Sequence, residues 1–368
     1  MSSSPLATPL ARFSTIGVGG PAQRFVRAPS EDALLATLAQ AVQAGAAVFI
    51  LGGGSNVVFH DEGFDGWVIQ PSSTRLSFHE EGEDVFVRAD AGVVWDTLVQ
   101  QTVARGLAGI EAMSGIPGHV GAAPIQNIGA YGQELSHTLT QVRAYDRRAG
   151  DVITLRNEDC DFAYRDSRFK RAGADAYVIL EVELRLRRPK GPLPLRYGDL
   201  RQHFGGETAP NVAQLRDAVL SIRAQKGMVY SPGDVDSHSV GSFFMNPVLD
   251  AAAAEQLKAK AQAAGLDGLP CYEQPDGRYK LSAAWLIERA GVSRGFRLGS
   301  AGISSKHVLA LMNPGHATAA DLRRLAQHVQ AAVWSQWGVW LTPEVRIMQR
   351  AGLDASFYTS SPLPSVVD

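Results

Sequence analysis

A long glycine-rich stretch with few charges, residues 106–132, constrains the fold more than any other part of this chain. It reads GLAGIEAMSGIPGHVGAAPIQNIGAYG, with glycine recurring throughout and two prolines. A flexible linker would be more polar, and a loop of this length inside a globular chain usually has a function. Gln126, Asn127 and Tyr131 offer directional hydrogen bonds. We therefore predict a loop that packs against a flat aromatic cofactor; a structural loop lying on a sheet is the alternative.

Length and composition narrow the class of protein. A chain of 368 residues exceeds one comfortable core, so two or three domains are expected. A net charge of -2 gives no indication of a nucleic-acid surface. No apolar run reaches the roughly 20 residues that span a bilayer, and the N-terminus lacks signal-peptide features. Cys160 and Cys271 have no metal-ligand spacing, so we expect free thiols, no metal site and a reducing, cytoplasmic compartment.

Helical and strand patterns are mixed along the chain, which predicts an α+β fold. Ser30 is a helix cap, and Gly45 ends that helix. Its apolar face is expected to hold Leu34, Leu35, Leu38, Ala41 and Val42. Asn211 caps a second helix, and Thr318 with Asp321 forms a capping box for a third. Further helices are expected at 95–106, 251–265 and 280–291, strands at 47–51, 66–70, 85–89, 177–187, 308–312 and 339–348, and a hairpin at 141–155.

Two glycine motifs invite a phosphate interpretation. LGGGSN, at 51–56, lies where a strand ends in a turn, and such turns expose backbone N–H groups that hold phosphate oxygens. A tight turn without a ligand is the alternative. The motif is neither a Walker loop nor a dinucleotide fingerprint, because the lysine and the spacing are missing. GVGGPA, at 17–22, fits a dinucleotide pattern, but no strand precedes it and Pro21 interrupts it, so we interpret it as a turn.

Several polar motifs each have a catalytic and a structural interpretation. Arg165 in YRDS offers a fork for a carboxylate, or forms a surface ion pair with Asp166. Lys226 is a ligand cation or merely suits a helix C-terminus. Glu344 in LTPEVR is a site residue or an exposed strand residue. Ser242 in GSFFMNP is a catalytic hydroxyl or the polar start of a buried strand.

In this order the motifs resemble the UDP-N-acetylenolpyruvoylglucosamine reductases, also called UDP-N-acetylmuramate dehydrogenases, of bacterial peptidoglycan synthesis. The matching stretches are LGGGSN, SGIPGHVGAAPIQNIGAYG, YRDS, YGDL, GSFFMNP and PEVR, and they run from about residue 13 to 348. CYEQPDG resembles the subtype with a mobile tyrosine loop. Met245 stands where many relatives have lysine, and His119 interrupts a run that usually has a small or β-branched residue.

The resemblance implies a three-domain flavoprotein. Two parts form an FAD-binding unit of the vanillyl-alcohol-oxidase type, and a third α+β domain binds substrate. The implied boundaries are 1–72 and 73–225 for the FAD-binding subdomains, with 325–350 completing the second. The substrate domain is 226–324, and we expect a disordered tail at 351–368.

The resemblance also implies the site. Ser242, Arg165 and Glu344 are catalytic, and Tyr197, Lys226, Asn246 and Tyr272 contact substrate. GGGSN cradles the FAD pyrophosphate, and the 114–132 loop lines the flavin. The implied contacts of non-covalent FAD are Gly52, Gly53, Gly54, Ser55, Asn56, Ser114, Gly115, Ile116, Pro117, Gly121, Ala122, Gln126, Asn127, Gly129, Ala130 and Tyr131.

The implied reaction suits these residue types. NADPH reduces FAD, and hydride then passes to C3 of UDP-N-acetylglucosamine enolpyruvate. The enolate-like intermediate needs positive charge and hydrogen-bond donors, which Arg165 and a protonated Glu344 would supply. Ser242 would protonate C2 and yield UDP-N-acetylmuramate. The expected protein is a monomer that acts in cell-wall synthesis, and thereby in cell shape and division. The alternatives are an FAD-dependent oxidase or dehydrogenase for a hydroxy acid or alcohol, and a non-enzymatic nucleotide-binding protein.

Overall fold

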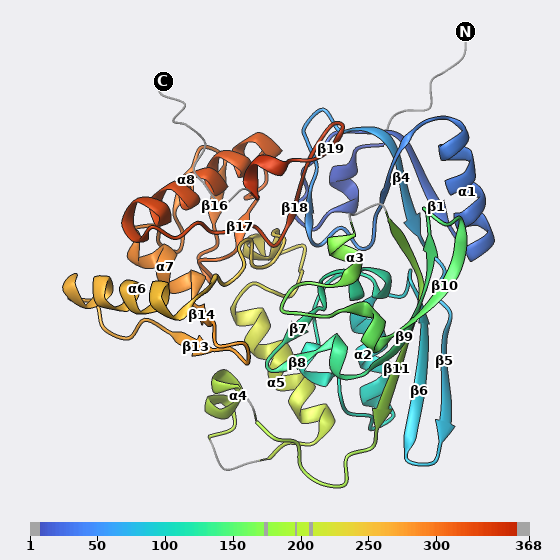
Figure 1. Ribbon diagram of the computed structural model, residues 1–368, viewed down its shortest axis with the longest axis horizontal. Helices are drawn as coiled ribbons and strands as arrows, with labels where there is room; N and C mark the ends of the chain where they lie inside the picture. The colour runs from blue at the N-terminus through green and yellow to red at the C-terminus, as the bar shows by residue number, and fades with distance from the viewer. Residues whose placement is uncertain (1–7, 173–175, 196, 206–208, 359–368) are drawn as a thin grey trace. The chain divides into compact units, whose positions relative to one another are not determined.

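The computed structural model describes residues 8–172, 176–195, 197–205 and 209–358. The chain separates into two compact units (Figure 1). Unit 1 comprises 1–8, 22–55 and 65–229, and unit 2 comprises 9–21, 56–64 and 230–368. Two short N-terminal segments thus belong with the C-terminal part of the chain. The three domain boundaries expected from the sequence stay predictions.

Unit 1 begins with a three-stranded sheet, ordered β1-β4-β2, on which helix α1 packs. The predicted cap is confirmed, because the Ser30 hydroxyl accepts a hydrogen bond from the Ala33 N–H at 3.2 Å. The buried face follows Leu34, Leu38 and Ala41. Val42 was predicted inside but is 65% exposed, since each residue advances the helix by about 100° and Val42 lies one residue beyond Ala41. The elements are β1 (Ala22–Ala28), α1 (Glu31–Gln43), β2 (Ala47–Ile50) and β4 (Phe64–Pro71).

The second part of unit 1 is a five-stranded antiparallel sheet, ordered β10-β9-β11-β6-β5. The predicted hairpin is β9–β10, and the predicted long strand is β11. Trp95 and Leu98 of α2 pack into the core of this sheet. The elements are β5 (Leu76–Glu81), β6 (Asp84–Asp90), α2 (Trp95–Ala104), β7 (Gly129–Ala130), β8 (Gln133–Glu134), β9 (Leu139–Asp146), β10 (Asp151–Arg156), α3 (Arg168–Arg171), β11 (Tyr177–Arg187), α4 (Gly198–His203) and α5 (Val212–Gln225).

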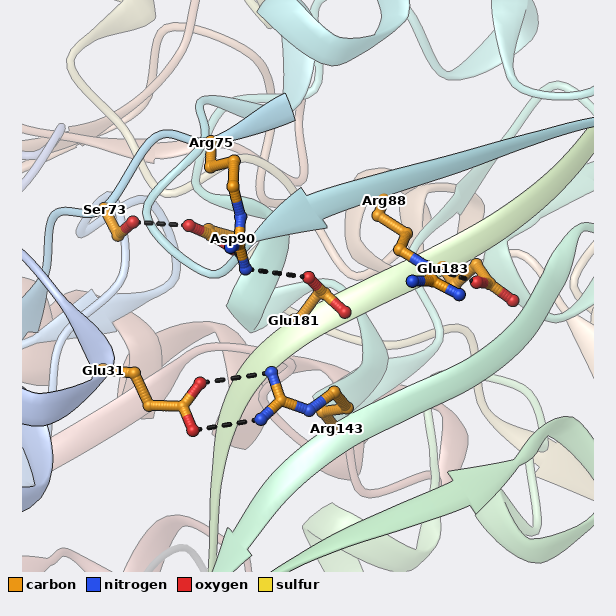
Figure 2. A network of polar contacts seen from close by, with 8 residues as sticks. All are labelled: Glu31, Ser73, Arg75, Arg88, Asp90, Arg143, Glu181 and Glu183. Carbon is orange, nitrogen blue, oxygen red and sulfur yellow. Dashed lines mark hydrogen bonds and ion pairs between the residues drawn. The ribbon is translucent and has the colours of Figure 1, made fainter. Parts of the chain in front are cut away.

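Among the residues that the structure describes, the buried carboxylates on this sheet pair with arginine (Figure 2). Arg75 bonds both Asp90 and Glu181 at 3.2 Å, and Arg88 bonds Glu183 at 2.6 Å. A fork from Arg143 to Glu31, at 3.0 and 3.1 Å, ties the start of α1 to β9. Because an unpaired buried carboxylate is costly, these pairs account for acidic residues at otherwise apolar positions.

The described residues of unit 2 form three small sheets, ordered β12-β14-β13, β15-β16-β17 and β19-β18-β3. The capping box of α8 is confirmed between Thr318 and Asp321. Asp61 also accepts the N–H groups of Ala319 and Ala320, at 2.7 and 2.9 Å, so a distant segment helps to cap this helix. The elements are β3 (Val57–Val58), β12 (Val248–Leu249), α6 (Ala251–Ala263), β13 (Cys271–Glu273), β14 (Tyr279–Leu281), α7 (Ala283–Arg289), β15 (Arg297–Leu298), β16 (Ala301–Ile303), β17 (Leu311–Met312), α8 (Ala319–Trp337), β18 (Arg346–Gln349) and β19 (Gly352–Leu353).

Strands in unit 2 are shorter than the sequence predicts. The strand expected at 308–312 is only β17, and the one expected at 339–348 begins at Arg346. Residues 351–358, expected to be disordered, form β19 and a 3₁₀ turn with Phe357 buried. The rest of the expected tail, 359–368, lies outside the described residues.

Cys160 and Cys271 are free thiols, as predicted. Among the helices that the structure describes, none combines the length and apolarity needed to cross a membrane.

Candidate active site

The LGGGSN turn follows β2 and presents backbone donors. Across the described part of the chain, the N–H groups of residues 52–55 find no protein acceptor. The Gly52 carbonyl accepts a hydrogen bond from Gln70 at 2.8 Å, which fixes the start of the turn. A run of unpaired donors in a glycine turn suits an anionic oxygen ligand.

A second glycine-rich segment, 117–122, packs directly on this turn within unit 1. A Cβ added to Gly53 would lie 2.7 Å from the Gly118 Cα, and a Cβ added to Gly118 would lie 2.9 Å from the Ser55 Oγ. The Ser55 hydroxyl donates to the Pro117 carbonyl at 3.0 Å. Both glycines are therefore needed for close backbone packing, and the cradle fits a diphosphate-bearing cofactor such as FAD.

Hydrogen bonds of its own buried side chains partly fix the glycine-rich loop. Ser114 is fully buried, and its hydroxyl donates to the Glu111 carbonyl at 2.6 Å. Buried Asn127 bonds Glu134, Ala163 and Ser136. Their side chains are thus engaged with the protein. The more accessible predicted FAD contacts are Ile116, Pro117, Gly121, Ala122, Gln126, Gly129, Ala130 and Tyr131.

Backbone strain gathers in this region. Asn127, Tyr131 and Arg165 all have positive φ, at 46°, 50° and 52°. Such conformations cost about 1–3 kcal/mol each in non-glycine residues and cluster at functional sites. The Arg165 guanidinium donates to the Gly129 carbonyl at 2.8 Å, so YRDS is tied to the loop. Asp166 pairs with Arg171 at 2.5 Å.

A buried arginine beside this loop was not predicted from the sequence. Arg223 of α5 is 9% exposed, and its guanidinium donates to the carbonyls of Gly115 and Met228 at 3.3 and 3.0 Å. Burial lowers the pKa of Arg223, and burial raises the pKa of Tyr131 to about 12. The available signal was an arginine adjoining the inward face of a predicted helix.

Two predicted substrate contacts lie together in unit 1. Lys226 pairs with Asp199 of the YGDL motif at 2.5 Å. Tyr197, 47% exposed, meets Tyr131 edge-on with ring centroids 5.4 Å apart. The YGDL motif thus connects Lys226 to the loop predicted to line the flavin.

Two motifs a hundred residues apart lie side by side in unit 2. The Glu344 N–H donates to the Phe243 carbonyl at 2.8 Å, and the Met245 N–H donates to the Thr342 carbonyl at 3.0 Å. Ser242 and Glu344 are both half-buried, while Phe243 and Phe244 are buried. The structure therefore holds the predicted serine and glutamate on neighbouring backbone segments.

Asn56 extends this arrangement. Its side-chain amide donates to the Glu344 carbonyl at 3.3 Å, and its own carbonyl accepts from the Arg346 N–H at 3.0 Å. The last residue of the GGGSN motif thus supports the backbone on both sides of Glu344 within unit 2.

Comparison with known proteins assigns both halves of the chain. Residues 22–156 match an FAD binding domain, and residues 233–348 match the C-terminal domain of UDP-N-acetylenolpyruvoylglucosamine reductase. The enzyme of that name from Thermobifida fusca is 48% identical over 91% of this chain and 95% of the relative. The one from Streptomyces coelicolor is 44% identical over 91% of this chain and 88% of the relative. The chain belongs to the UDP-N-acetylenolpyruvoylglucosamine reductase family.

A solved reductase of this name shows the same fold. The protein from Thermus caldophilus covers 93% of this chain and 98% of its own, with a TM-score of 0.63 and 24% identity. The α+β, multi-domain prediction is confirmed. The FAD-binding match contains both glycine-rich segments, and the reductase match contains GSFFMNP and PEVR. The chain is thus an FAD-dependent reductase.

The remaining predicted reductase contacts lie in unit 2. The Asn246 side-chain oxygen accepts the Ala283 N–H at 2.9 Å, at the start of α7. Tyr272 is 59% exposed on the β13–β14 hairpin, where it pairs with Lys280. The stretch that resembles a mobile tyrosine loop thus forms a short hairpin. Mobility of this segment stays a prediction.

Proposed function

We propose that this chain reduces UDP-N-acetylglucosamine enolpyruvate to UDP-N-acetylmuramate with electrons from NADPH. The observation that supports this proposal is the backbone pairing of GSFFMNP with LTPEVR, in which the Glu344 N–H donates to the carbonyl of Phe243, the residue after Ser242. When bound, FAD accepts hydride from NADPH and passes hydride to C3 of the substrate. The protein's own residues bind the substrate, orient it and supply the proton.

Binding of FAD is assigned to the two glycine-rich segments. The N–H groups of residues 52–55, which are unpaired within the described ranges, would hold the diphosphate, and the loop at 114–132 would line the flavin. Ser114 and Asn127 are also predicted FAD contacts. They would act by fixing that loop, because their side chains already have protein partners.

The chemical step is assigned to three residues. Addition of hydride to C3 leaves an electron pair at C2, which spreads into the carboxylate. Arg165 and a hydrogen bond donated by the Glu344 side chain would stabilise this charge. The Ser242 O–H would give its proton to C2, and the resulting alkoxide regains a proton from solvent. The net change consumes one NADPH and one proton per enolpyruvyl group.

Substrate binding is assigned to Tyr197, Lys226, Asn246 and Tyr272. Lys226 would bind the substrate diphosphate, with Asp199 as its protein partner. Asn246 would contribute its amide nitrogen, because its oxygen is engaged by the Ala283 N–H. We further propose that the enzyme acts as a monomer in the cytoplasm.

Glu344 offers a test of the hydrogen-bond role. Glu344→Gln keeps a donor and should reoxidise reduced flavin within about tenfold of the wild-type rate. Glu344→Ala removes the donor and should lose roughly 10²–10³-fold. Stopped-flow measurement of flavin reoxidation by substrate separates the two variants. Equal, complete loss in both would argue that Glu344 transfers a proton instead.

Anaerobic mixing with NADPH distinguishes the proposed function from its alternatives. The purified protein should be yellow, and its flavin absorbance should bleach. A yellow protein that NADPH does not bleach would favour a flavin oxidase or dehydrogenase of hydroxy acids or alcohols. A colourless protein that takes up no FAD would favour a non-enzymatic nucleotide-binding protein.

A further inference from the structure

His119 stands over the GGGSN turn in unit 1. A Cβ added to Gly53 would lie 3.2 Å from the His119 Cδ2, and one added to Gly52 would lie 3.9 Å from the His119 Cβ. In the imidazole ring, Cδ2 neighbours Nε2. This edge of the ring therefore lies beside residues whose N–H groups have no acceptor in the described part of the protein.

The other ring nitrogen defines the tautomer. Nδ1 of His119 is buried and has no hydrogen-bond partner among the residues that the structure describes. A proton on Nδ1 would be a buried, unsatisfied donor, which is costly, so the neutral ring should carry its proton on Nε2. The imidazole then carries its donor next to Cδ2, on the ring edge that lies beside Gly53.

The charge near His119 comes from arginine and favours binding of an anion. The segments packed on it, 52–55 and 91–94, contain no titratable side chain. From β1, Arg27 acts on the ring, and burial followed by the Arg27 charge lowers the pKa of His119. Arg27 bonds Gln70 at 3.1 Å, and Gln70 bonds the Gly52 carbonyl, so this cation also borders the turn.

We propose that His119 is an FAD ligand that donates an Nε2–H hydrogen bond to the diphosphate. This inference rests on the proposed function, because it requires the FAD diphosphate to occupy the glycine cradle.

The proposal predicts the direction in which FAD affinity changes with pH. A bound diphosphate dianion would raise the pKa of His119 above its lowered value in the apoprotein. Because the pKa of His119 rises on binding, the complex takes up a proton. FAD should therefore bind more tightly as the pH falls from the His119 pKa of the complex to that of the apoprotein. Each unit of pKa rise corresponds to about a tenfold change in affinity.

Two amide variants test the geometry. The Gln amide nitrogen can replace Nε2, whereas the shorter Asn amide reaches only the position of Nδ1. At pH 8, where His119 is neutral, FAD should bind His119→Gln within about threefold of wild type and His119→Asn at least about tenfold more weakly. The dissociation constants come from quenching of flavin fluorescence on titrating the apoprotein with FAD.

A pH series adds a readout that a structural role would not change. Wild type should bind FAD more tightly at pH 6 than at pH 8, and His119→Gln should lose this trend. Nuclear magnetic resonance of wild type should show the His119 pKa rising on FAD binding.

The outcomes separate this inference from the function on which it rests. Equal affinities for the Gln and Asn variants, or an unchanged His119 pKa in the FAD complex, would overturn the role of His119 while leaving an FAD enzyme. Failure of the wild-type apoprotein to bind FAD would instead overturn the proposed function.

Discussion

Replacing Ser242 by alanine is expected to slow flavin reoxidation by the enolpyruvyl substrate by roughly 10²–10⁴-fold, while NADPH still reduces the flavin at the wild-type rate. The reason is that hydride arrival at C3 leaves a strong base at C2, and a positioned hydroxyl is its proton source. Flavin reduction needs no such donor. Stopped-flow absorbance of each half-reaction, run separately and without oxygen, measures both rates.

Ser293→Ala is the matched control, because Ser293 is an exposed serine in the same unit. It should leave both half-reactions unchanged. If Ser242→Ala also reoxidises at the wild-type rate, Ser242 is not the donor. If it slows reduction by NADPH equally, the substitution has disturbed the flavin site rather than proton transfer.

Gly53→Ala is expected to weaken FAD binding by roughly 10- to 100-fold. The added methyl would lie 2.7 Å from the Gly118 Cα and 3.1 Å from the Gly118 carbonyl carbon, which are backbone atoms that cannot rotate away. The turn and the loop must separate, and an extra methyl in a packed site typically costs about 1–3 kcal/mol. Titration of the apoprotein with FAD gives the dissociation constant.

Gly191→Ala provides the comparison, since a Cβ there meets no atom within 4 Å. Its FAD affinity should equal that of wild type. An unchanged FAD affinity in Gly53→Ala would show that the packing of these two segments does not form the FAD cradle. Circular dichroism of both variants checks that the fold is retained.

Local signals in the sequence predicted local structure well. The caps at Ser30, Asn211 and Thr318 formed as expected, because each depends on side-chain contacts within a few residues. Strand lengths near the C-terminus were overestimated, since a strand ends where its partner ends. β18 pairs with β3, which is only Val57–Val58, and periodicity could not reveal that partner.

Parts of the candidate site could be recognised only from the folded structure. Motif order predicted the family, but nothing local placed LTPEVR against GSFFMNP across a hundred residues. Arg223 was missed because a helical pattern describes apolar positions and says nothing about a buried cation beside them. His119 was visible only as a departure from a pattern. Its unpartnered Nδ1 and its contact with the glycine turn come from packing.

Reoxidation of the NADPH-reduced protein by UDP-N-acetylglucosamine enolpyruvate tests the proposed function most directly. The protein is reduced anaerobically with one equivalent of NADPH and mixed with substrate, and flavin absorbance is followed. We predict that the oxidised spectrum returns with one UDP-N-acetylmuramate formed per flavin. A flavin that stays bleached with substrate, yet recovers when oxygen is admitted, would contradict the account.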